Sequence, residues 1–211
     1  MPDSLIDQLV KSFRKFPGIG PRQARRFVYY LLRANHHTVE ALTQQMRELK
    51  KSVIQCPSCL RFHASPAGVL AKAGKGCPIC LDKTRDHRLL LIIEKDMDLE
   101  NVERTDTYNG YYFVLGGLIP ILDKEPEQRI RGKKLLETIE EHRVKGLQEI
   151  ILALSANPEG DYTAQFVKKL IFPICANFEI KVSTLGRGLS TGTELEYSDA
   201  DTLKNALKHR E

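Results

Sequence analysis

The run Leu89-Leu90-Leu91-Ile92-Ile93-Glu94 is the stretch of sequence that decides the fold. A short, uninterrupted apolar run that ends on a charged residue is typical of a strand buried on both faces, as in parallel sheets. Further apolar runs at residues 111–115, 150–154 and 180–185 have the same texture, with polar helical patterns between them. Strands that alternate with helices need crossover connections, so the sequence predicts an α/β domain with a mostly parallel sheet.

The residues before this domain are predicted to be helical. Apolar side chains recur at helical spacing in three segments: one behind Ser4, one after the turn at 16–21, and one that begins at Thr38 as its cap. A short helix capped by Ser198 is expected near the C-terminus. The predicted organisation is a helical region at 1–54, a cysteine-bearing knuckle at 55–82, the sheet domain at 83–178 and a C-terminal segment at 179–211.

The positive charge of the chain is concentrated near its N-terminus. No carboxylate lies between Asp7 and Glu40, although the net charge of the whole chain is only +5. Around the turn Phe16-Pro17-Gly18-Ile19-Gly20, glycines leave backbone N–H groups uncovered near a helix start, where a phosphate can bind without its base being read. The alternative is a helix-helix turn with a solvated basic face. The predicted DNA-contacting residues are Lys11, Arg14, Lys15, Gly18, Gly20, Arg22, Arg25 and Arg26.

Four of the five cysteines form two C-x-x-C pairs, Cys56 with Cys59 and Cys77 with Cys80. Two such turns can supply four thiolates to one tetrahedral zinc ion, and a site filled by four protein ligands leaves no position for a catalytic water. We therefore predict one structural zinc per chain. His63 and His87 are alternative ligands close in sequence, and free thiols or a redox pair are the alternative chemistry. Cys175 lies in an apolar run and is expected to be buried.

Glu94 ends the first predicted strand, at the edge where open α/β sheets bind ligands. The arrangement resembles the Toprim domain, which pairs such a glutamate with an Asp-x-Asp motif after a later strand to bind magnesium. Here Ser155-Ala156-Asn157 follows that strand, while Glu159 and Asp161 come slightly later. Weak magnesium binding by Glu94 and Glu159 stays open, but the expectation is a protein that is not an enzyme.

The turn with its flanking helices is similar to the helix-hairpin-helix motif of sequence-independent DNA-binding proteins. The order of helix-hairpin-helix, four-cysteine site and Toprim domain resembles the RecR family of bacterial recombination mediators over nearly the whole chain. The stretches that carry this resemblance are residues 111–117, Glu159-Gly160 with Thr163-Ala164, Arg187-Gly188-Leu189, and residues 194–197. The sequence departs from the usual pattern of this family in three places. They are a longer loop between the cysteine pairs, the segment 190–193, and the segment after Pro120.

The resemblance implies a non-enzymatic DNA-binding protein of recombinational repair that acts with RecO and RecF to load recombinase on gapped DNA. It also implies a homo-oligomer, a dimer or a ring-shaped tetramer, whose basic segment faces DNA and whose acidic Toprim surface faces RecO. Two other classes stay open, a magnesium-dependent Toprim nuclease or primase and a zinc-stabilised interaction module. No stretch approaches the roughly 20 apolar residues of a membrane span, and the first residues are unlike a secretion signal, so a cytoplasmic location is expected.

Overall fold

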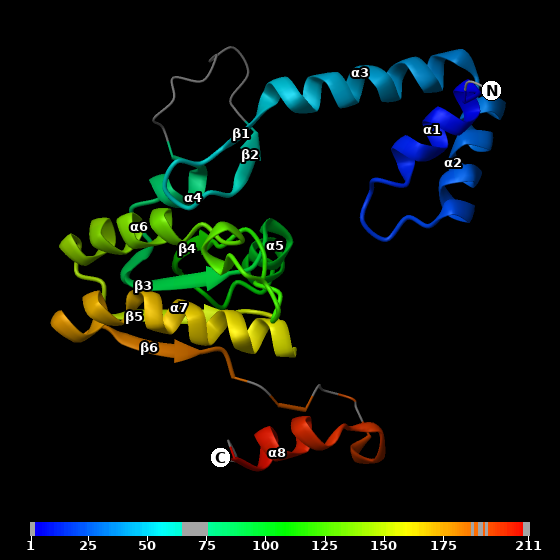
Figure 1. Ribbon diagram of the computed structural model, residues 1–211. Coiled ribbons are helices and arrows are strands. Elements are labelled where there is room, and N and C mark those ends of the chain that lie inside the picture. The colour runs from blue at the N-terminus through cyan, green and yellow to red at the C-terminus, as the bar shows by residue number, and fades with distance from the viewer. Residues whose placement is uncertain (1–2, 65–75, 187, 190–191, 193, 209–211) are drawn as a thin grey trace. The chain divides into compact units, whose positions relative to one another are not determined.

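The computed structural model describes residues 3–64, 76–186, 188–189, 192 and 194–208. The long loop between the cysteine pairs, at 65–75, and most of the segment 190–193 lie outside the described residues. The chain forms two compact units, Met1–Val53 and Ile54–Glu211, each with its own core (Figure 1).

The first unit consists of three helices, α1 (Leu5–Phe13), α2 (Pro21–Arg33) and α3 (His36–Ser52). Helices α1 and α2 pack through a small core of Val10, Ala24 and Val28. Helix α3 has no buried residue among those described. The prediction that Thr38 caps α3 is wrong: the Asn35 side chain caps it by accepting the Thr38 N–H at 2.8 Å. Asn35 can do this because its carbonyl sits three residues before that amide, the usual reach of an N-cap.

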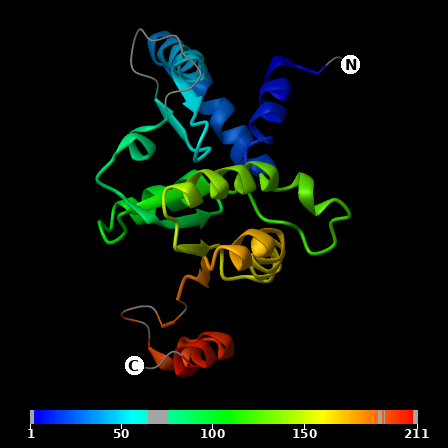
Figure 2. The same ribbon diagram turned by 90° about the vertical axis from the view of Figure 1, so that its left-hand side faces the viewer.

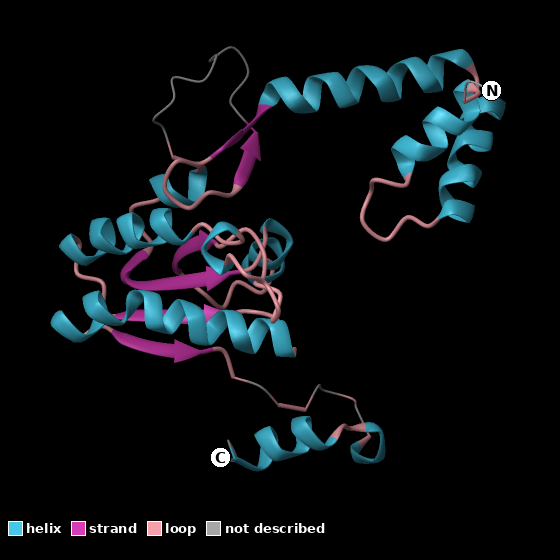
Figure 3. Cartoon of the chain, in the orientation of Figure 1, coloured by secondary structure: helices cyan, strands magenta, loops and turns pink. Residues whose placement is uncertain are grey.

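The second unit is built on a four-stranded parallel sheet of order β4-β3-β5-β6 (Figure 3). Its strands are β3 (Asp86–Ile93), β4 (Gly110–Val114), β5 (Glu149–Ala153) and β6 (Lys181–Thr184). Crossover helices connect them: α5 (Asp96–Glu103), α6 (Gly132–Val144) and α7 (Pro158–Asn177). The predicted α/β class and parallel sheet are confirmed.

The two faces of this sheet have different cores because successive strand residues point to opposite sides. On one face Leu90 and Ile92 pack with the inner residues of α6 and α7, such as Ile139 and Val167. Figure 2 shows the ribbon turned by 90°, with α6 and α7 beside the sheet. On the other face Leu91 and Ile93 pack with Leu99 of α5 and with the cysteine cluster. Every residue of β4 is buried. The cysteine knuckle is thus part of one face of the sheet's core.

Short elements complete the second unit. They are β1 (Val53–Gln55) and β2 (Phe62–Ala64), which pair with each other, α4 (Pro78–Leu81), the 3-10 turns η1 (Pro126–Gln128) and η2 (Leu195–Tyr197), and α8 (Ala200–Lys208). The Ser198 cap predicted for α8 is wrong, since Asp199 accepts the Thr202 N–H at 2.9 Å. The divergent segment after Pro120 is a turn in which Asp123 pairs with Arg129.

Candidate nucleic-acid interface and metal centre

The turn between α1 and α2 presents backbone without side-chain cover. Gly18 has φ +76°, a left-handed conformation that glycine adopts without strain, and a Cβ on Gly18 or Gly20 would meet nothing within 4 Å. Gly20 is the N-cap of α2 and Pro21 is its first residue, and no side chain caps this helix start. The N–H groups of the first turn are therefore left to solvent or to an anion, whose negative charge the helix dipole favours.

The predicted cations of this unit differ in how far they are already neutralised. Lys11 contacts Asp3, and Arg25 Nη2 lies 3.7 Å from the Asp7 carboxylate, so these two cations have acidic partners. Within the part of the chain that the structure describes, no carboxylate forms an ion pair with the four remaining predicted cations, Arg14, Lys15, Arg22 and Arg26. These four exposed side chains lie on either side of the turn that contains both glycines.

The outward face of α2 carries two residues that the sequence analysis did not select. Tyr29 and Tyr30 are exposed and line one shallow groove together with arginines of the same face, namely Arg22, Arg25, Arg26 and Arg33. Helical spacing in the sequence was a signal that could have identified them. Tyr29 lies about one turn after Arg26 and two turns after Arg22, on the same face of the helix. Ala24 and Val28, on the opposite face, are buried in the core of the unit.

The four predicted cysteines meet in a single cluster. Their sulfur atoms all lie within 4.8 Å of one another; Cys56 Sγ is 3.8 Å from Cys80 Sγ, and Cys59 Sγ is 3.6 Å from Cys77 Sγ. A zinc ion about 2.3 Å from each of four sulfurs places neighbouring sulfurs about 3.8 Å apart, so the cluster fits a tetrahedral site. The cluster is compatible with zinc. Among the described residues it is the only group of three or more potential ligand side chains, so His63 and His87 do not join it.

Local backbone geometry turns the thiols inward. Leu60, directly after Cys59, has φ +61°, and its N–H donates to the Cys56 carbonyl at 3.1 Å. The Cys77 N–H donates to Cys56 Sγ at 3.3 Å. Hydrogen bonds from the side chains of the other three cysteines lower the pKa of Cys56, because they stabilise its thiolate. The thiolate, the form that binds metal, is therefore favoured at Cys56, while the same shared hydrogen bonds raise the pKa of Cys59 and Cys80.

Cys175, the fifth cysteine, is one of the buried residues of α7, apart from this cluster. Burial raises the pKa of its thiol.

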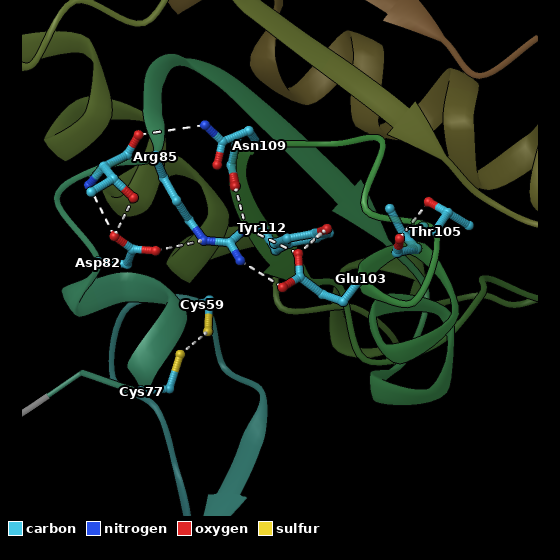
Figure 4. A network of polar contacts seen from close by, with 11 residues as sticks. Cys59, Cys77, Asp82, Arg85, Glu103, Thr105, Asn109 and Tyr112 are labelled. Atoms are coloured by element: carbon cyan, nitrogen blue, oxygen red, sulfur yellow. Dashed lines mark hydrogen bonds and ion pairs between the residues drawn. The ribbon is translucent and has the colours of Figure 1, made fainter.

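A polar network lies beside the cysteine cluster (Figure 4). Arg85 Nη2 is 2.6 Å from Glu103 Oε2, and the Tyr112 hydroxyl donates to the other oxygen of Glu103 at 2.6 Å. Burial alone would raise the pKa of Glu103, but the hydrogen bonds from Arg85 and Tyr112 outweigh it and lower the pKa. This network connects the end of α5 to β4 and to the residues just after the knuckle.

The carboxylate at the end of β3 has partners from this chain. The Ser155 hydroxyl donates to Glu94 Oε2 at 2.5 Å, and Lys95 Nζ lies 3.3 Å from Glu94 Oε1. Both Glu94 oxygens are therefore engaged, one of them by a cation of the protein itself. Gly160 approaches the same loop so closely that a Cβ there would lie 1.8 Å from the Ser155 carbonyl oxygen. Glu159 and Asp161 lie in the first turn of α7.

Comparison with known proteins agrees with this architecture. Family models match in chain order: RecR, helix-hairpin-helix at residues 6–50, the Toprim domain at 88–186, and RecR, C-terminal at 188–211. The matches define a protein that combines a helix-hairpin-helix region with a Toprim domain.

Relatives resemble the chain over its full length. The recombination protein RecR of Bifidobacterium adolescentis is 37% identical over 99% of this chain and 96% of its own length. That of Dehalococcoides mccartyi is 35% identical over 98% and 94%, and that of Herpetosiphon aurantiacus is 35% identical over 97% and 93%. The chain belongs to the RecR family of recombination proteins, which places it in DNA repair by recombination. None of its described helices is both long and apolar enough to cross a membrane.

Proposed function

We propose that the chain is a non-enzymatic DNA-binding mediator that acts with RecO and RecF to load recombinase on gapped DNA. The observation that carries the DNA-binding part is the uncapped start of α2, where the glycine turn meets the unneutralised side chains of Arg22 and Arg26. Backbone amides and arginines there can hold phosphate oxygens. The roles of RecO and RecF follow from membership of the family.

Binding through this surface is expected to ignore base sequence. The donors at the hairpin are backbone N–H groups and cations, which contact phosphates and carry no information about base edges. Arg14, Lys15, Arg22 and Arg26 are the principal contacts in this proposal. Lys11 and Arg25 contribute less, because Asp3 and Asp7 already neutralise part of their charge.

A charge-matched comparison tests the assignment. Replacing Arg22 and Arg26 with Gln is expected to weaken duplex binding at least tenfold at moderate salt. The control replaces Arg88 and Arg104 of the second unit with Gln, which removes the same charge from β3 and from the C-cap of α5 and is expected to change affinity little. If the first variant bound duplex as tightly as the unaltered protein, the hairpin would not be the DNA site.

The absence of catalysis is supported by the end of β3. Ser155 stands where a magnesium-binding Toprim domain has its first aspartate, and it donates to Glu94 instead of adding a negative charge. The Lys95 ammonium occupies the other oxygen of Glu94. We infer that Glu94, at the end of β3, and Glu159, exposed in the first turn of α7, are structural or partner-contacting residues, and that magnesium has no resident role.

We infer that the four cysteines hold one structural zinc ion. Three of the four side chains are buried in the core that they share with the sheet, where a metal bound to four protein ligands stabilises the fold. Zinc in this position would fix the knuckle against β4 and α5.

We also propose that the chain assembles with copies of itself into a dimer or a ring-shaped tetramer. Helix α3 exposes an apolar row of Leu42, Met46 and Leu49, and α1 exposes Leu5. Exposed apolar side chains gathered on one helix mark an interaction surface. The solution mass of the full chain, measured with and without DNA, should be a multiple of the monomer. Met46→Glu should lower it; a monomer throughout would exclude a ring.

We further propose that the protein is cytoplasmic. We also propose that it consists of a helical region at 1–54, a cysteine knuckle at 55–82, a sheet domain at 83–178 and a C-terminal segment at 179–211. The organisation agrees in order with the three family models, although the Toprim match extends to residue 186.

A further inference from the structure

Tyr29 and Tyr30 lie in the open on a surface made of arginines. Their side chains are 47% and 64% exposed. Neither hydroxyl has a hydrogen-bond partner among the described residues, so neither ring is held in place by a polar contact within the first unit. The groove that they line is otherwise formed by Arg22, Arg25, Arg26 and Arg33. The helix therefore presents two aromatic rings flanked on both ends by cations.

This aromatic pair lies at a defined distance from the hairpin. Seven residues separate Tyr29 from Arg22, which is about 10 Å along a helix axis at 1.5 Å per residue. Stacked DNA advances 3.4 Å per nucleotide, so this distance corresponds to roughly three nucleotides. A strand held by its phosphates at the hairpin would reach the tyrosines within that length, and Arg33 would lie beyond them.

We propose that the outer face of α2 binds single-stranded DNA by stacking unpaired bases on Tyr29 and Tyr30. Each base has an apolar face that can stack on a tyrosine ring whatever its identity, while the arginines on either side of the two rings hold the phosphates. In a duplex those faces are covered by neighbouring base pairs, so only an unpaired base can use the rings. This inference rests on the proposed function and assigns to α2 the single strand of a gap.

The positive charge of the groove favours a polyanion as its occupant and disfavours a second copy of the same surface. In a two-fold dimer the same patch meets itself, which would bring two sets of four arginines together. Like charges placed opposite each other cost free energy, and among the residues that the structure describes only Arg25 of the four has an acidic partner to offset this. Nucleic acid supplies the negative charge that the groove lacks, together with flat base faces that can stack on its two tyrosine rings.

The experiment uses the full chain with two probes of equal length, a fluorescein-labelled thymidine oligonucleotide and a duplex. Tyr29→Ala and Tyr30→Ala should each weaken binding of the single strand about tenfold. Duplex binding should change less than twofold. Tyr29→Phe and Tyr30→Phe keep the rings and should bind the single strand like the unaltered protein. Tyr197→Ala, at a tyrosine that is 77% exposed in η2, is the matched control and should have no effect.

Three outcomes overturn the inference. Unchanged affinity of the alanine variants for the single strand would exclude stacking. Equal losses for both probes would show that the tyrosines act on the phosphate site or on the fold. A change of solution mass without loss of single-strand binding would show that the face pairs with a protein surface. If the unaltered chain bound the duplex only weakly, with no salt dependence, the proposed function itself would fail, whatever the tyrosines do.

Discussion

The backbone N–H of Val114, the last residue of β4, donates a hydrogen bond of 2.8 Å to the carbonyl of Cys59. The knuckle is thereby attached to the edge of the parallel sheet. Arg131 reinforces the attachment by donating to the carbonyls of Leu60 and Val114, each at 3.0 Å. Thr138 in α6 donates to the Ser58 carbonyl at 3.2 Å. These contacts make the geometry of the cysteines and the stability of the sheet mutually dependent.

Removal of a cysteine ligand is expected to destabilise the sheet domain along with the knuckle. Cys77→Ser takes away one of four thiolates, and a metal site whose binding free energy contributes to folding is then lost. Metal analysis should give about one zinc per chain for the unaltered protein and much less for the variant, with a lower melting temperature. Cys175→Ala, outside the cluster and without a buried hydroxyl, is the control and should keep its zinc. A metal-free protein with an unchanged melting temperature would contradict the zinc assignment.

The ion pair between Arg85 and Glu103 is expected to stabilise the second unit more than a surface pair does. The side chain of Arg85 is only 12% exposed, so loss of its partner leaves a poorly solvated charge. Glu103→Gln should lower the free energy of unfolding by about 2 kcal/mol. Glu100→Gln, which breaks the exposed pair with Arg104, should cost less than about 0.5 kcal/mol. Chemical denaturation of both variants makes the comparison, and equal losses would show that burial of Arg85 does not matter.

The stability of the second unit is expected to depend on pH through His142. Burial, helped by the nearby Lys145 and His87, lowers the pKa of His142 to about 4. The unfolded histidine has a pKa of about 6.5, so between these values the unfolded chain binds more protons. Stability from this group is therefore complete above about pH 6.5 and falls as the pH is lowered toward about 4, by about 3 kcal/mol in all.

Denaturation curves between pH 4.5 and 7.5 check this. His142→Phe should flatten the dependence, because Phe has no proton to gain and can keep the ring contact with Tyr111. His37→Gln, at an exposed position of α3, should leave the dependence as it is. If the His142→Phe protein lost stability with falling pH as steeply as the unaltered one, another group would be responsible.

Magnesium is expected to have no effect on DNA in the presence of this protein. Glu94 already accepts from Ser155 and pairs with Lys95, so a divalent ion would have to displace these partners to bind it. Incubation of gapped and single-stranded DNA with the chain and magnesium should leave both strands intact, and Glu94→Gln should bind DNA like the unaltered protein. Magnesium-stimulated cleavage that Glu94→Gln abolishes would instead establish a Toprim nuclease.

Much of the sheet could be predicted from sequence because β4 and the second half of β3 are buried on both faces. The run before Glu94 is uninterrupted by polar residues, and β3 ends at Ile93 as expected, although its first residues, from Asp86, are polar and were not part of the prediction. The cysteine cluster was also predictable, since two C-x-x-C turns restrict where the thiols can meet. The short strands β1 and β2 were not, because three residues carry no detectable period.

Side-chain caps and surface pairings could not be predicted with the same success. Asn35 and Thr38 are both acceptable caps by residue type, and only the course of the backbone decides between them. The neutralisation of Arg25 by Asp7 depends on how α1 packs against α2. Tyr29 and Tyr30 were missed because each, taken alone, is an ordinary exposed residue; their significance comes from the arginines that the helix places beside them.

The dependence of DNA affinity on salt tests the central claim most directly. The measurement is the slope of the logarithm of the binding constant against the logarithm of salt concentration, for two duplexes of unrelated sequence. Contacts from Arg14, Lys15, Arg22 and Arg26, on the order of four phosphates, predict a slope of about −3.6 and equal affinities for both duplexes. A slope near zero, or a strong preference for one sequence, would contradict the claim that the hairpin holds DNA by its phosphates.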